Sequence, residues 1–261
     1  MPIYAEQRWG YDLPYFLSAT AKCHPNYATY LIKKETLSIE KIEKVLSLIP
    51  LSERSEYNSK LIESIYLQMQ DFEMDDSLFF ENLKDKINGK KVLIIGSGAS
   101  VLSHESVIKK KSQDCVIISV NFVPISHVVD FVFISNEKRL FAQDLTRVDN
   151  IIATSNLKDN LPNAMLFNYS SLLGEGDSLD NAGAMLIRIL KMCKVKKILM
   201  AGFDGFDVDS SMNYAVPKFK KSVDYNTAKK KNEDISKQLK LALKGVDYEF
   251  ITPTKYKISD I

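Results

Sequence analysis

From residue 90 onward, short apolar runs alternate with longer segments of helical periodicity. The apolar runs predict strands over 92–95, 115–120, 131–134, 151–153, 164–167, 197–201 and 248–251. Apolar residues at helical spacing predict amphipathic helices over 181–193 and 226–244. Apolar strands that alternate with helices are typical of a parallel sheet covered on both faces. The pattern therefore predicts a Rossmann-like α/β domain over residues 89–261.

The first third of the chain shows a different period, with almost no strand signal. Its clearest helical stripe is formed by Ile39, Ile42, Val45, Leu46 and Ile49, which Pro50 ends. Further helices are expected over 27–34, 52–70 and 77–87. Residues 1–88 are thus predicted to be an all-helical region, either a bundle or a helical cap.

The first apolar run of the α/β part ends in a glycine turn that also contains Ser97 and Ala99. Gly96 and Gly98 permit close approach of a ligand to the backbone. The N–H groups that open the following helix favour an anion, and Ser100 adds a hydroxyl. The turn is therefore a candidate phosphate site. The alternative is a tight strand-to-helix turn that binds no ligand.

This turn departs from two common phosphate-binding motifs. Val101 stands where the dinucleotide-binding motif Gly-x-G-x-x-Gly has its third glycine. No Gly-Lys-Ser or Gly-Lys-Thr follows, so the turn is not a Walker A loop. The sequence thus disfavours NAD and an ordinary P-loop nucleotide site.

Polar residues follow several of the predicted strands. Asn121 and Asn136 end the second and third apolar runs, where a base or ribose would be bound beyond the carboxyl ends of parallel strands. Asp180, Asn181 and Gly183 open the helix over 181–193 after a glycine-rich loop. The alternatives are that the asparagines simply begin loops, and that Asp180 or Asn181 only caps the helix.

Two carboxylates follow the sixth predicted strand. Asp204 is expected to project into the same crevice as the glycine turn, and Asp204 with Asp207 could hold Mg²⁺ beside a diphosphate. No protein ligand set for a metal is predicted, because His24, His104 and His127 lack metal-ligand spacing and form no Ser-His-Asp order.

The net charge of +2 gives no bulk electrostatic reason to expect nucleic-acid binding. Local lysine runs, such as 229–231, are expected to be solvated faces or to attract an anionic substrate. Three widely spaced cysteines form no disulfide framework, and no membrane span or signal peptide is predicted. A cytoplasmic location is expected.

The order and spacing of these blocks resemble those of bacterial sialyltransferases of glycosyltransferase family 42 and the related pyrophosphokinase-like family of archaeal pterin enzymes and flagellin-glycosylation proteins. The resemblance covers roughly residues 90–253 and rests on Ile-Ile-Gly-Ser-Gly-Ala-Ser, Ser-Val-Asn-Phe, and the block that begins at Asn181 and runs through Ala-Gly-Phe-Asp-Gly-Phe. It implies a nucleotide or CMP-sugar site. The glycine turn and Asn121 would contact the phosphate and nucleoside, and residues 181–183 would lie near the donor.

The chain departs from the sialyltransferase pattern at two places. Those enzymes use a histidine as general base before the last long helix, and residues 221–226 contain none. By elimination, Asp204 or Asp224 is expected to be the base. Tyr214 is the candidate to replace the tyrosines that assist the departing phosphate.

Residues 9–27 resemble the helical segment that follows the barrel in HMG-CoA lyase-like and 4-hydroxy-2-oxovalerate aldolases. The barrel and its His-x-His motif are absent from this sequence. The resemblance implies the C-terminal part of a longer polypeptide or a shortened relative, with an aldolase domain as partner. A second copy of the chain is the alternative partner.

Three functions follow from these patterns. The first is a nucleotide-sugar-dependent glycosyltransferase in surface-polysaccharide synthesis. The second is a pyrophosphokinase-like enzyme that uses ATP and Mg²⁺ in the same crevice. The third is a non-catalytic regulatory or assembly module that descends from an aldolase fusion.

Overall fold

The computed structural model describes residues 74–135, 137–158, 160–172, 181–209, 211, 213–216, 219 and 222–258. The helices expected before residue 74 lie outside these ranges. The last helix expected in the N-terminal region is α6 (Ser77–Ile87), and it forms over the predicted residues. Its buried residues, Leu83 and Ile87, pack against the core of the α/β part.

The strands form one parallel sheet. Every strand pair in it is parallel, in the order β5-β4-β3-β2-β1-β6-β7. The strands are β1 (Lys91–Ile95), β2 (Cys115–Val120), β3 (Phe131–Ile134), β4 (Ile151–Thr154), β5 (Met165–Phe167), β6 (Lys197–Ala201) and β7 (Tyr248–Phe250). The Rossmann-like α/β prediction for this part of the chain is confirmed.

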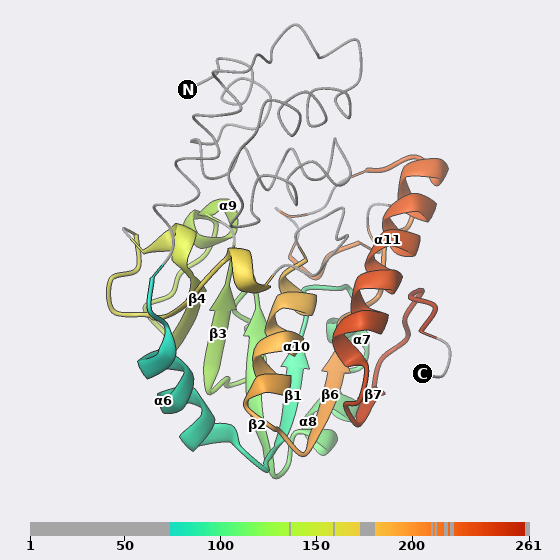
Figure 1. The fold of residues 1–261 in the computed structure, drawn as a ribbon. Coiled ribbons are helices and arrows are strands. Elements are labelled where there is room, and N and C mark those ends of the chain that lie inside the picture. Colours follow the sequence, from blue (N-terminus) through green and yellow to red (C-terminus); the bar gives the residue numbers. More distant parts are fainter. Residues whose placement is uncertain are drawn as a thin grey trace, which may run out of the picture.

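Helices cover both faces of the sheet. On one face α10 (Ala182–Met192) and α11 (Tyr225–Leu243) join α6 over the alternate strand residues that include Val92, Ile94 and Ile118. Figure 1 shows α10 and α11 on the near face. The opposite face packs against α7 (Ser100–Ser103), α8 (Glu105–Lys111) and α9 (Glu137–Phe141). Two 3₁₀ turns, η2 (Ser155–Leu157) and η3 (Ser170–Leu172), complete the described elements.

The strand order contains one reversal, between β1 and β6. The chain runs outward from β1 to β5 and then returns, through α10, to pair β6 with the free side of β1. In open α/β sheets ligands bind outside the carboxyl ends of the strands at such a reversal. The loops that leave β1 and β6 at this point are the glycine turn and residues 202–205.

The helix and strand boundaries differ from the sequence-based ranges by one or two residues at most. Asn181 lies inside the predicted range but is the N-cap of α10, and Asp224 is the N-cap of α11. The side chain of each accepts a backbone N–H of the first turn. Among the described residues, no helix is long and apolar enough to cross a membrane.

Candidate functional site

Two backbone hydrogen bonds join the glycine turn to the loop that follows β6. The N–H of Gly96 donates to the carbonyl of Ala201 at 2.7 Å, and the N–H of Gly98 donates to the carbonyl of Gly202 at 3.0 Å. These bonds extend the β1–β6 pairing beyond the sheet. They hold the two loops side by side at the reversal of strand order.

The glycines are required by this packing. A Cβ added to Gly98 would lie 2.6 Å from the Gly202 carbonyl oxygen and 2.5 Å from Cγ of Asp204. A Cβ on Gly96 would lie 2.6 Å from the same oxygen, and Gly202 itself has a φ of +71°. Gly96 and Gly98 were expected to let a ligand approach the backbone closely. In the structure, Gly202 and Asp204 of the same chain occupy that space.

Asp204 occupies the start of the helix that follows the glycine turn. Its carboxylate accepts the backbone N–H of Ser100 at 2.7 Å and also the Ser100 hydroxyl. Ser100, expected to contact a phosphate, thus donates both hydrogens to a carboxylate of its own chain. Within the described residues, the N–H groups of Ser97 and Ala99 are the backbone donors of this turn that make no hydrogen bond.

Burial raises the pKa of the Asp204 carboxyl above its usual value. The hydrogen bonds from Ser100 and the positive charges of His104 and Lys255 lower the pKa and only partly oppose this effect. A partly buried carboxyl with a raised pKa is a better proton acceptor than an exposed one, so Asp204 is a candidate general base.

Residues after β7 complete the surroundings of Asp204. The N–H of Lys255 donates to the Asp204 carbonyl at 2.9 Å, and the hydroxyl of Thr252 accepts the N–H of Gly202 at 2.9 Å. Burial, with the nearby Tyr214 and Asp204, raises the pKa of the Tyr256 phenol, which keeps it protonated. The sequence analysis missed these three residues, although they follow the carboxyl end of the last strand as the polar residues of the other strands do.

Tyr214 lies beside the glycine turn, as expected for a residue of this site. The N–H of Ala215, the next residue, donates to the carbonyl of Ser97 at 2.9 Å. The Tyr214 ring packs edge-on against Phe206 and Phe219, and the guanidinium of Arg139 lies 4.8 Å from its centre. These contacts fix the ring beside the glycine turn.

Asn121 joins the carboxyl ends of β2 and β3. Its Oδ1 accepts the N–H of Ser135 at 3.1 Å, its own N–H donates to the carbonyl of Phe133, and its φ of +55° is left-handed. Asn tolerates this conformation and commonly starts loops. The side chain therefore has a structural role here, and its expected contact with a nucleoside stays a prediction. Asn136 lies outside the described residues.

Asn181 and Gly183 lie at the start of α10. The Oδ1 of Asn181 accepts the N–H of Ala184 at 2.9 Å, which is the predicted capping bond. Gly183 is buried, and a Cβ there would lie 2.6 Å from the ring of Phe203. The first turn of α10 thus packs on the loop after β6, which brings it close to Asp204. Asp180 lies outside the described residues.

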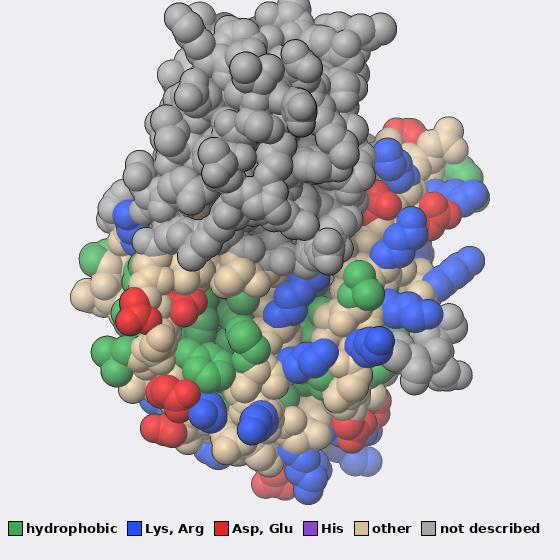
Figure 2. Space-filling model, viewed as in Figure 1, with side chains coloured by type: hydrophobic (Ala, Val, Ile, Leu, Met, Phe, Trp, Pro, Cys, Tyr) green, Lys and Arg blue, Asp and Glu red, His purple; other side chains and the backbone are tan. Residues whose placement is uncertain are grey.

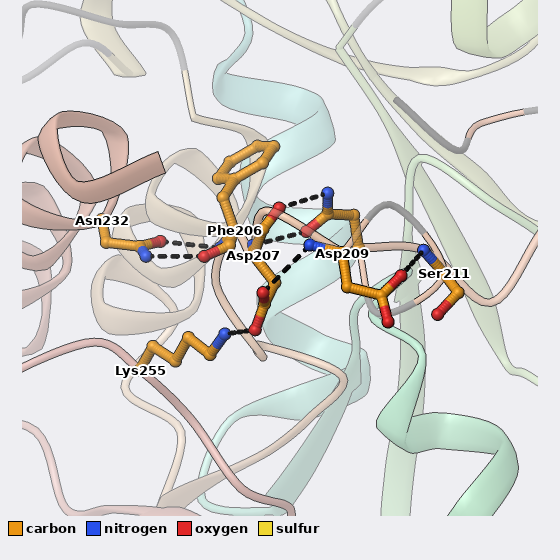
Figure 3. Close-up of polar contacts among 7 residues, drawn as sticks. Phe206, Asp207, Asp209, Ser211, Asn232 and Lys255 are labelled. Atoms are coloured by element: carbon orange, nitrogen blue, oxygen red, sulfur yellow. Dashed lines mark hydrogen bonds and ion pairs between the residues drawn. The ribbon is translucent and has the colours of Figure 1, made fainter. Parts of the chain in front are cut away.

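The two carboxylates suggested for Mg²⁺ have different partners. Asp204 binds Ser100, whereas Asp207 forms an ion pair with Lys255 and accepts the N–H of Asp209 at 3.1 Å (Figure 3). In the described part of the chain, no group of three or more His, Cys, Asp or Glu side chains could hold a metal. A Mg²⁺ ion at this point would have to be held largely by a bound diphosphate.

Asp224 caps α11 and is exposed. Its carboxylate accepts the N–H of Thr227 at 2.9 Å and the Thr227 hydroxyl, and these two bonds lower its pKa. A lowered pKa weakens a carboxylate as a base. Of the two expected bases, the geometry therefore favours Asp204 over Asp224.

The comparisons with protein-family models and with curated protein sequences find no match to this chain.

Proposed function

We propose that the α/β domain is a nucleotide-sugar-dependent glycosyltransferase that binds its donor above the carboxyl ends of β1 and β6. The observation that carries this proposal is the position of Asp204, a carboxyl with a raised pKa, at the one reversal of strand order among the described strands. The resemblance to glycosyltransferase family 42 supports a CMP-sugar as the donor and surface-polysaccharide synthesis as the setting.

In this reaction an acceptor hydroxyl oxygen attacks the anomeric carbon of the donor sugar. The bond from that carbon to the phosphate oxygen breaks, CMP leaves, and Asp204 accepts the hydroxyl proton. The bonds from Ser100 hold the carboxylate in place and leave it further lone pairs. Positioning and stabilisation of the leaving phosphate would supply most of the rate enhancement.

The hydrogen-bond donors that remain free in the glycine turn determine where a phosphate can bind. Since Ser100 donates to Asp204, a phosphate would bind the N–H groups of Ser97 and Ala99 rather than those of Ser100. Both residues are half-buried and lie next to the segment that carries Tyr214. A phosphate at this point would therefore lie between the glycine turn and Tyr214.

Thermal shifts with CMP, CTP, ATP and GTP, each with and without Mg²⁺, test the proposal. Selective stabilisation by CMP or CTP without metal is expected. A response to ATP only with Mg²⁺ would favour a pyrophosphokinase-like enzyme instead. No response to any nucleotide would favour the non-catalytic module, for which internal packing accounts for the glycines of the turn.

A matched pair of variants tests the position of the phosphate. Ser97→Asp adds a negative charge to the glycine turn, so it should abolish the shift with CMP. Ser112→Asp adds the same charge directly after α8, near the amino ends of β1 and β2, and should leave the shift unchanged. Equal responses of the two variants would refute a phosphate at the turn.

A further inference from the structure

A groove of about 610 Å³ lies between α11 and the segments that follow β6 and β7. Three of its lysines, Lys229, Lys237 and Lys240, project from α11, and Lys255 and Lys257 come from the segment after β7. Figure 2 shows Lys and Arg side chains gathered over α11, on the right of the view. The groove thus has a basic lining on both sides.

The walls of this groove are held by internal hydrogen bonds. The amide of Asn232 accepts the N–H of Phe206 at 2.7 Å and donates to the carbonyl of the same residue at 2.9 Å (Figure 3). The N–H of Lys257 donates to the Ser236 hydroxyl at 3.0 Å. Because α11 is tied to both flanking segments, the groove is formed before a ligand arrives, as most small-molecule sites are.

The lysines of the groove outnumber its carboxylates. Asp207 and Glu233 are the acidic side chains of the lining, and Asp207 forms an ion pair with Lys255. Among the described residues, the other four lysines form no ion pair with a carboxylate. The groove therefore carries an excess of positive charge that an anionic ligand would neutralise.

The spacing of the lysines indicates an extended ligand. Lys229 and Lys240 are eleven positions apart on α11, which corresponds to about 16 Å along the helix axis. A single phosphate or monosaccharide cannot contact both. A chain that carries several negative charges can do so.

The remaining lining favours a polyhydroxylated anion. The carboxylates of Asp207 and Glu233 accept hydrogen bonds from hydroxyl groups. Tyr225, 69% exposed, offers an aromatic face at the N-terminal end of α11. A nucleic acid carries one phosphodiester charge per nucleotide and few free hydroxyls for the two carboxylates to bind. A carboxylated sugar chain brings one charge per acidic residue and many hydroxyls.

We propose that this groove binds a carboxylated oligosaccharide, the acceptor of the transfer. The acceptor role rests on the proposed function, whereas the binding itself does not. The groove adjoins Asp204 through Lys255, whose N–H donates to the Asp204 carbonyl at 2.9 Å. The end of a chain bound along α11 would then lie next to the loop that carries Asp204.

Calorimetric titration of the full chain with a galacturonic acid hexamer tests the binding. The hexamer should bind, and maltohexaose, a neutral chain of equal length, should bind at least tenfold more weakly. A thymidine hexanucleotide and inorganic phosphate should also bind at least tenfold more weakly than the acid. Tighter binding of the hexanucleotide would overturn the proposal in favour of a nucleic acid, and an absence of binding by the galacturonic acid would overturn it outright.

Two double variants locate the binding. The double variant Lys237→Ala with Lys240→Ala should lower the affinity for the galacturonic acid hexamer at least tenfold. Lys109→Ala with Lys110→Ala removes the same charge from α8, outside the groove, and should change the affinity less than twofold. Equal losses of affinity in the two double variants would indicate non-specific charge attraction and would refute the groove as the binding site. The CMP shift, measured on the wild type and the same variants, separates the two proposals. Its absence with intact hexamer binding would refute the proposed function, and with it the acceptor role, but not the binding of the oligosaccharide.

Discussion

The backbone N–H and the hydroxyl of Ser100 both donate hydrogen bonds to the carboxylate of Asp204, 104 positions further along the chain. The carboxylate therefore takes the place at the start of α7 that an anionic ligand would otherwise occupy. This pairing joins the loops after β1 and β6. It also determines how the glycine turn can bind a phosphate.

Because Asp204 is partly buried, the difference in stability between the wild type and Asp204→Asn should depend on pH. Because the folded pKa lies above the unfolded value of 3.8, the folded protein binds more protons between the two values, so its stability falls as pH rises through that interval. The variant lacks this loss. The melting temperature of the wild type should therefore decline relative to the variant from about pH 4 toward neutrality. A constant difference would contradict the raised pKa.

As a general base, Asp204 must also be ionised for transfer to occur. The acidic limb of the pH–rate profile should lie at higher pH than for an ordinary aspartate, since burial raises the pKa. Asp204→Asn keeps an oxygen that can accept a hydrogen bond from Ser100 but cannot take the proton, so turnover should fall by about 10²–10⁴-fold. Retention of turnover in this variant would exclude Asp204 as the base.

Gly98→Ala should destabilise the fold. Its Cβ would lie 2.6 Å from a backbone oxygen of Gly202, which cannot move without breaking the β1–β6 loop contact, so we expect a loss of about 1–3 kcal/mol in denaturant unfolding. Gly183→Ala is the matched control, because its Cβ meets the edge of the Phe203 ring, a side chain that can shift. A larger loss for Gly183→Ala would show that the two loops are less tightly joined than described.

Asn181→Ala removes the cap of α10 and should cost about 1 kcal/mol in unfolding free energy. Asn181→Asp keeps the accepting oxygen and should retain most of this stability. If the side-chain N–H₂ contacts the nucleotide-sugar substrate, as the resemblance implies, both variants should lose part of the rise in melting temperature that CMP causes. Wild-type CMP binding by Asn181→Asp would limit Asn181 to capping.

Variants at Asp224 test which of the two expected residues, Asp204 or Asp224, is the general base. Asp224→Ala should lower the melting temperature because it removes the bonds to Thr227, and Asp224→Asn should largely restore it as a good N-cap. Transfer activity of Asp224→Asn should equal that of the wild type. A variant that is stable but inactive would transfer the role of base from Asp204 to Asp224.

Much of the fold could be predicted because its strands are short apolar runs bounded by turns. The ranges 115–120, 131–134 and 197–201 were predicted without error. The Ser100–Asp204 bond could not be derived, because it depends on β6 returning to the free side of β1. Periodicity identifies strands but not their order, so the sequence placed both residues in one crevice and did not predict that they bind each other.

The meaning of the glycines could not be decided from the sequence either. Gly96 and Gly98 were interpreted as leaving room for a ligand, whereas the room is filled by Gly202 and Asp204. Thr252 and Tyr256 were missed because the strand that precedes them, β7, is only three residues long and its carboxyl end is hard to locate from apolar periodicity. Most features that the sequence did not predict are therefore contacts between loops that are distant in the sequence.

The return of the chain to β1 has a consequence for biosynthesis. Until residues 197–201 emerge from the ribosome, the edge of β1 that β6 covers is an unpaired row of backbone groups flanked by buried side chains. Such an edge readily pairs with another chain. Pairing over so long a sequence separation is also slow to form. Truncated products that end before β6 should therefore aggregate, and completion of the sheet must wait until residues 248–250 of β7 have been made.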